Sequence, residues 1–311
     1  MAFTTPSPVR RKVVASIAAA LAAGLALTGC ATAAPDTSEP AVPQAAESPF
    51  GHIHGFGINS TSGEAFVASH NGVFKLPSLD SDPIAAAELG EPVAGRAQDT
   101  MGFTMNGRQM FGSGHPDPAE QSAPPNLGFI TSTDNAETWQ TVSLGGEKDF
   151  HEIEVVRDAA GTITVYGVDS STSQIMISGN GGTSWRPGAE VLVRDVSVDP
   201  VSGVVYATTE NGLALSSDGG ETFEVDPDAP ALYLVDWVDG PSSEGLVGVD
   251  LEGNVWTRLG AEEWIMSGSV EGDVSAMMYS ATPEPALLVA DARGVVASGD
   301  LGATWRVVVK P

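Results

Sequence analysis

The octapeptide Ser216-Ser217-Asp218-Gly219-Gly220-Glu221-Thr222-Phe223 decides the fold, because variants of it recur along the chain. The other copies are STDNAETW ending at Trp139, SGNGGTSW ending at Trp185, SGDLGATW ending at Trp305, and a degenerate TRLGAEEW ending at Trp264. The closing aromatic residues are 46, 38, 41 and 41 residues apart. A repeat of about 40 residues with strand-like flanks is typical of a β-propeller, which has one four-stranded sheet per repeat.

Each copy has the composition of a tight hairpin. The Asp or Asn oxygen can accept hydrogen bonds from backbone N–H groups of the turn, and glycine allows a positive φ. The closing aromatic side chain can pack between neighbouring sheets. The motif resembles the Asp-box (BNR) repeat of sialidase-like propellers. It is a structural motif and does not by itself imply catalysis.

Aligning the strands on these motifs predicts a six-bladed, all-β propeller over residues 50–311, at about 44 residues per blade. The innermost strands should begin near His52, Asp99, Phe150, Arg194, Leu234 and Ser275. The fourth strands are the least distinct, the first blade has no recognisable turn motif, and the closure of the ring is not readable. No segment has a helical period. The 36 glycines and 21 prolines fit many short strands joined by turns.

The first thirty residues predict export and lipidation. Arg10, Arg11 and Lys12 precede an apolar run that is long enough for a signal peptide and short for a membrane-spanning helix. The run ends in LTGC at Cys30, which resembles a bacterial lipoprotein signal, in which the cysteine is lipidated and becomes the mature N-terminus. The alternative is an ordinary signal peptide followed by a buried core cysteine.

These features divide the chain into a signal peptide (residues 1–29), a lipidated Cys30 with a flexible linker (30–49), and the propeller (50–311). The linker is rich in Ala, Pro, Ser and Glu and lacks periodicity. Two or more acyl chains on Cys30 would anchor the protein stably. We therefore expect a monomeric lipoprotein on the extracytoplasmic face of the cell membrane.

Charge and cysteine content exclude several classes of function. The chain has 40 acidic and 14 basic residues, a net charge of −26. Removal of the signal peptide would leave 11 basic residues against 40 acidic ones. Such a surface excludes a nucleic-acid binder, which needs basic side chains to displace counterions from phosphate, and it attracts cations. A single cysteine excludes an intramolecular disulfide and a cysteine-built metal site.

All five histidines fall in the predicted blades one to three. His52 and His54 begin the first innermost strand and, being two residues apart, point to one side. His70 ends the second strand of that blade, and His151 begins the third innermost strand. His115 lies in the long loop between the second and third strands of blade two. In a propeller these positions share one rim, so the histidines should converge there.

Convergent imidazoles indicate a transition-metal site, since neutral imidazole is a ligand for zinc, copper, iron and nickel. Met101 occupies in blade two the position of His54 and His151 in their blades, and histidine with methionine favours copper. Histidine with carboxylate favours zinc or iron. Asp99 and Asp149 lie nearby and could orient a ligand ring through its second nitrogen. The alternative is that the histidines bond loops or bind an anionic or sugar ligand.

The wider pattern of HIHGFGIN, VASHNGVF, GSGHPDP and DFHEIEV resembles a group of bacterial secreted or lipid-anchored Asp-box propellers described as sialidase-like or glycosylhydrolase-like. The resemblance covers about residues 50–311 and implies a site on the top face near the axis.

A true sialidase clamps the substrate carboxylate with three arginines and uses a Tyr–Glu nucleophile pair. The mature chain would hold eight arginines, and Arg186 and Arg306 follow motif tryptophans on the opposite rim. Sialidase activity is therefore disfavoured. Another glycosidase could use Asp117 and Glu152 as its two carboxylates. A further alternative is a non-catalytic propeller that docks an envelope protein or a glycan on this rim.

Overall fold

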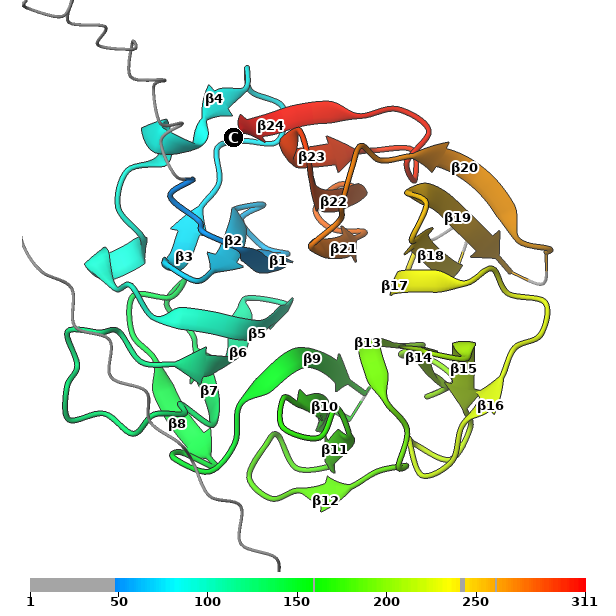
Figure 1. Ribbon diagram of the computed structural model, residues 1–311, viewed down its shortest axis with the longest axis horizontal. Coiled ribbons are helices and arrows are strands. Elements are labelled where there is room, and N and C mark those ends of the chain that lie inside the picture. The colour runs from blue at the N-terminus through cyan, green and yellow to red at the C-terminus, as the bar shows by residue number, and fades with distance from the viewer. Residues whose placement is uncertain (1–47, 159, 241–243, 261) are drawn as a thin grey trace, which may run out of the picture. The chain divides into compact units, whose positions relative to one another are not determined.

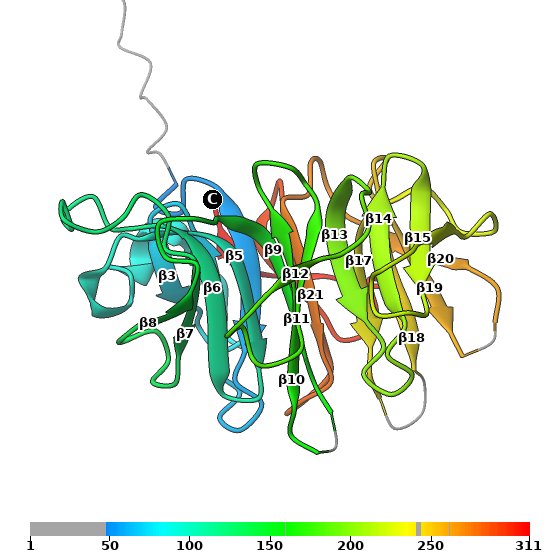
Figure 2. The same ribbon diagram turned by 90° about the horizontal axis from the view of Figure 1, so that it is seen from below.

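The computed structural model describes residues 48–158, 160–240, 244–260 and 262–311. These residues form six sheets around a central axis, with one innermost strand of each sheet facing the centre (Figure 1). Consecutive strands within each blade pair antiparallel. Seen from the side, the strands run between two faces at which the turns gather (Figure 2). The expected six-bladed, all-β propeller is confirmed. The predicted signal peptide, Cys30 and nearly all of the linker lie outside the described residues.

The strands follow chain order from the innermost to the outermost position of each blade. Blade one holds β1 (Ile53–Ile58), β2 (Ala65–Ser69) and β3 (Gly72–Lys75); blade two holds β5 (Asp99–Asn106), β6 (Gln109–His115), β7 (Phe129–Ser132) and β8 (Gln140–Ser143); blade three holds β9 (Phe150–Arg157), β10 (Ile163–Asp169), β11 (Ile175–Ser178) and β12 (Arg186–Pro187). Blade four holds β13 (Val193–Val198), β14 (Val205–Thr209), β15 (Gly212–Ser216) and β16 (Glu224–Val225); blade five holds β17 (Leu232–Val238), β18 (Gly245–Asp250), β19 (Asn254–Leu259) and β20 (Ile265–Ser269); blade six holds β21 (Ala276–Ser280), β22 (Ala286–Asp291), β23 (Gly294–Ser298) and β24 (Arg306–Lys310). Each innermost strand begins within two residues of the predicted position.

The short strand β4 (Ile84–Ala85) closes the ring. It follows β3 in sequence but pairs in parallel with β24, through Val309↔Ile84 and Lys310↔Ala85 (Figure 1). Blade one therefore has three strands and blade six has five. This exchange explains why no turn motif and no fourth strand are readable in blade one.

Helical structure is confined to short connections. In the described part of the chain, the helical segments are the 3₁₀ turns η1 (Ala86–Leu89) and η2 (Val93–Gly95), which follow β4. Across those same residues, no helix has the length and apolarity needed to cross a membrane.

The turn motif forms the same hydrogen bonds in four blades. Its serine hydroxyl accepts the N–H four residues later, at 3.0 Å from Ala136, 2.9 Å from Gly182, 2.8 Å from Gly220 and 2.8 Å from Gly302. The Asp or Asn Oδ1 accepts the N–H of Thr138, Ser184, Thr222 or Thr304 at 2.8–3.0 Å. The motif therefore satisfies the backbone donors of a turn that would otherwise be unpaired.

The closing aromatic residue packs onto the preceding blade. The ring of Trp185 in blade three lies 5.3 Å from the ring of Phe129 in blade two, and 4.8 Å from that of Phe150. Trp139 packs in the same way on the cluster containing Phe66 of blade one. Each repeat thus supplies both its own turn and the apolar contact that joins it to its neighbour.

Ser216→Ala should lower the free energy of unfolding by about 2 kcal/mol, because it leaves the buried N–H of Gly220 without a partner. The Ser216 hydroxyl also donates to Asp218 at 2.7 Å. The matched control is Ser217→Ala, which truncates an exposed neighbouring serine. Urea denaturation measures both variants, and equal midpoints for the two would contradict the role assigned to the hydroxyl.

Candidate metal centre

A β-bulge places one side chain at the start of five of the six innermost strands. The register of each strand with its neighbour skips one residue in blades one to five. The skipped residues are His54, Met101, His151, Arg194 and Tyr233. Because bulges redirect the side chain of the extra residue, these five are structurally equivalent positions on one rim. The predicted equivalence of Met101 with His54 and His151 agrees with this register. Its role as a ligand stays a prediction.

The structure arranges the five histidines in two groups on this rim. The first, which we call the histidine triad, is His52, His54 and His70, with Asp99 from the adjacent β5. The second, the Asp149 cluster, consists of His115, Asp149 and His151. Among the described residues, no hydrogen bond or ion pair joins the two groups. The sequence suggested a single cluster.

The triad brings three imidazoles together from one blade. One potential ligand nitrogen of each ring lies within 4.8 Å of the others. His52 Nδ1 is 3.5 Å from His54 Nδ1, and His54 Nε2 is 3.3 Å from His70 Nδ1. The bulge aims His54 inward, where its side chain is only 9% exposed, whereas His70 in the β2–β3 turn is 44% exposed.

Asp99 of the neighbouring blade lies against two rings of the triad. Its Oδ1 is 2.9 Å from His70 Nδ1 and 3.6 Å from His54 Nε2. No aligned hydrogen bond reaches this buried oxygen. Burial disfavours the ionised carboxylate, but the two imidazoles outweigh it, so the pKa of Asp99 lies below its usual range. Asp99 is therefore a fixed negative charge against the rings.

The electrostatics favour neutral imidazole at His52. Burial, followed by the proximity of His54 and His70, lowers the pKa of His52. A neutral ring offers a lone pair, which is the form that binds a metal ion.

Each of the two contacts between neighbouring rings has a spacing that one ion could bridge. Two nitrogens bound to one zinc at about 2.0–2.1 Å lie at most about 4 Å apart. The observed contacts of 3.5 Å and 3.3 Å fall in this range. The contact with His52 uses Nδ1 of His54, whereas the contact with His70 uses Nε2. One ring must therefore turn before all three histidines can bind the same ion.

The loop carboxylate Asp117 has a local structural role. Its Oδ2 accepts the N–H of Ala97 at 2.8 Å, and its Oδ1 accepts that of Ala119 at 2.7 Å. These backbone donors lower the pKa of Asp117. Glu152, its suggested partner in a glycosidase, instead lines the central channel, 4.0 Å from Arg194.

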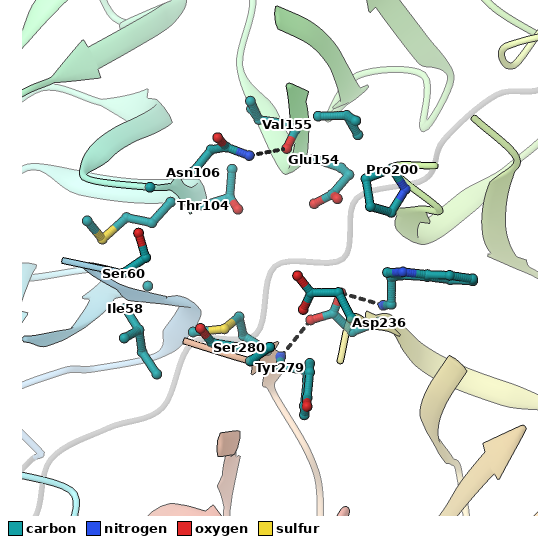
Figure 3. Close-up of a pocket in the computed structure, with 18 of the residues that line it drawn as sticks. Ile58, Ser60, Thr104, Asn106, Glu154, Val155, Pro200, Asp236, Tyr279 and Ser280 are labelled. Atoms are coloured by element: carbon teal, nitrogen blue, oxygen red, sulfur yellow. Dashed lines mark hydrogen bonds between the residues drawn. The ribbon is translucent and has the colours of Figure 1, made fainter. Parts of the chain in front are cut away.

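The channel contains, besides Glu152, three carboxylates that nothing in the sequence singled out. Glu152 and Glu154 of β9, Asp195 of β13 and Asp236 of β17 line it. At the mouth opposite the histidines, the channel widens into a cavity of about 430 Å³ into which Glu154 and Asp236 point (Figure 3). The adjoining part of the channel, which Glu152 lines, is a much smaller cavity of about 50 Å³. Alternation of glutamates with the buried Ile153 in HEIEVV could have revealed this lining.

Crowding and burial raise the pKa values of these carboxyl groups. Burial is the main cause in each, and the neighbouring carboxylates add to it at Glu154 and Asp236. The pKa rises to about 6 at Asp195 and to about 7 at Asp236, and it rises well above the usual range at Glu152 and Glu154. Asp195 and Asp236 also join blades, because they accept the N–H groups of Val235 and Tyr279 on the next innermost strands.

Glu154→Gln should stabilise the protein at pH 8, since the raised pKa of Glu154 means that its ionisation in the folded protein costs free energy. A raised folded-state pKa means that the native protein binds more protons than the unfolded chain. The stability that the protonated carboxyl group contributes is therefore full below about pH 4. It is lost as the pH rises through the raised pKa of the folded protein.

The difference between Glu154→Gln and wild type should consequently be small at pH 5 and larger at pH 8 in thermal melts. The control is Glu224→Gln, which removes an exposed glutamate on β16. A stability gain that does not depend on pH would contradict the assigned cause.

Comparisons with known proteins support the fold. No protein-family model matches the chain, and no curated protein matches it. A chain in the crystal structure of a nidogen/laminin complex is similar with a TM-score of 0.57 at 15% identity, covering 80% of this chain and 93% of that one. An ancestral GH74 enzyme is similar with a TM-score of 0.53 at 11% identity, over 83% of this chain and 46% of the enzyme. This chain thus spans less than half of that enzyme, and such identities show the propeller fold alone.

Proposed function

We propose that this protein is a lipid-anchored propeller of the cell surface that binds one zinc or copper ion through His52, His54 and His70. The observation that carries the proposal is the convergence of the three ligand nitrogens within 4.8 Å of one another. Lipidation of Cys30 would place this rim in the extracytoplasmic space, where it could take up or hand over the ion.

Three features of the triad support a metal ion over a simple hydrogen-bonded cluster. The low pKa of His52 keeps its ring in the ligand form. Asp99 supplies a negative charge at the rings, which favours an added cation. Exposure of His70 leaves a path for the ion from solvent. Because the ligands come from the residues before β1, from its bulge and from a turn, the loaded site can exchange its ion without opening the core.

His70→Ala should weaken Zn²⁺ binding by at least about tenfold, because even loss of a group that only supports a ligand costs 10- to 100-fold. Calorimetric titration of metal-free protein lacking a polyhistidine tag measures this, with Cu²⁺ as a second probe and excess Mg²⁺ present to occupy surface carboxylates. Glu210→Ala is the matched control, because Glu210 holds the corresponding position in the β14–β15 turn of blade four. Equal affinity of wild type and His70→Ala for both ions would contradict the proposal.

Glycoside hydrolysis is the second candidate, favoured by Glu154 and Asp236 in the 430 Å³ cavity. A carboxyl group with a pKa of about 7, as at Asp236, can act as a general acid near neutral pH. If the cavity is catalytic, Glu154→Gln should lower the rate of release of nitrophenol from nitrophenyl glycosides by about 10²–10⁴-fold. Wild-type protein without activity on such glycosides, or a variant as active as wild type, would remove this candidate.

A further inference from the structure

The Asp149 cluster lies on the same rim as the triad but is built by different blades. His115 ends β6 of blade two, whereas Asp149 and His151 flank the start of β9 of blade three. His151 Nε2 is 3.0 Å from Asp149 Oδ2, and His115 Nε2 is 3.6 Å from the same oxygen. Two imidazole nitrogens therefore approach one carboxylate from two blades.

The hydrogen bond of His115 fixes which of its nitrogens carries the proton. His115 Nδ1 lies 2.9 Å from the carbonyl oxygen of Pro125, which can only accept. Nδ1 must therefore be the donor, and in the neutral ring Nε2 presents its lone pair. Nε2 is also the nitrogen that lies 3.6 Å from Asp149 Oδ2. Two electron-rich atoms at this distance repel each other unless a positive charge lies between them.

The carboxylate of Asp149 is a second, independent observation that points to a cation. Its side chain is only 7% exposed, and its Oδ1 is buried without a hydrogen-bond partner. A buried carboxylate oxygen without a partner is costly, because the group has lost its water and gained nothing in exchange. Both histidines remain open to solvent, at 44% and 48% exposure, so an ion can enter from the rim.

We propose that His115, Asp149 and His151 form a second site, for a divalent transition-metal cation of the zinc or iron(II) class. Two imidazoles and one carboxylate are borderline ligands of the kind that these ions take, and three protein ligands leave further coordination positions for water or a substrate. The bond from His115 Nδ1 to the Pro125 carbonyl is the arrangement by which proteins orient a metal-bound imidazole.

The loop between β6 and β7 holds this geometry. Leu127 N donates to the carbonyl oxygen of Gly114 at 2.8 Å, and this bond closes the loop behind His115. The same loop supplies the Pro125 carbonyl. The second site is thus assembled by the loop, by the end of β6 and by the bulge of β9, and it shares no residue with the triad.

The test counts Zn²⁺ equivalents bound by metal-free protein in equilibrium dialysis against excess Mg²⁺. Wild type should bind two equivalents. His70→Ala should keep one, and His70→Ala with His115→Ala should keep none. Asp149→Asn, which retains the shape of the side chain and removes its charge, should lower the affinity of the second equivalent by at least tenfold. Glu210→Ala should leave both equivalents, and thermal melting should show that each variant is folded.

The outcomes separate this proposal from the triad. If wild type binds one equivalent that disappears in His70→Ala, the triad stands and the second site is refuted. If wild type binds a single equivalent, and this equivalent survives in His70→Ala and disappears in His115→Ala, the second site stands and the triad fails. If His115→Ala and Asp149→Asn change no binding, the cluster is an imidazolium–carboxylate pair and the proposal is overturned.

Discussion

Each blade of this propeller can bury an apolar face only against its neighbour, so the whole structure depends on the ring being closed. The turn motif provides most of these contacts, because its tryptophan packs on the preceding blade, as Trp185 does on Phe129. Between blades six and one the contact is made differently. The parallel pairing of β4 with β24 ties the two ends of the ring together, and a shared core contains Phe56 of blade one and Leu288 of blade six.

Much of this architecture could be predicted from the sequence because its determinants are local. A serine, an acidic or amide side chain and a glycine or alanine in fixed order make the same turn in four blades, so periodicity alone gives the number of sheets and nearly the first residue of each innermost strand. The closure could not be predicted in this way. Strand β4 has two residues and pairs with a partner more than 200 residues away, and nothing in Ile84–Ala85 marks that choice.

The same contrast applies to the candidate site. Blade alignment placed the five histidines on one rim, and it identified Met101, His54 and His151 as equivalent. It could not divide the histidines between two aspartates, because that division depends on side-chain direction and on the path of the loop that carries His115. Of the channel carboxylates, Glu152 was noticed in the sequence, and Glu154, Asp195 and Asp236 were missed for another reason. Asp195 and Asp236 read as ordinary strand residues until neighbouring strands place them beside Glu154.

The extra residue at the start of five of the six innermost strands has a consequence beyond metal binding. Since it is left out of the backbone pairing, its side chain is not required for sheet formation, and the five positions carry such different groups as imidazole, thioether, guanidinium and phenol. Each of these side chains can therefore be replaced singly while the sheets keep their backbone pairing. The side chains at these five positions can therefore change, and with them the ligand that this rim binds, with little effect on the stability of the propeller.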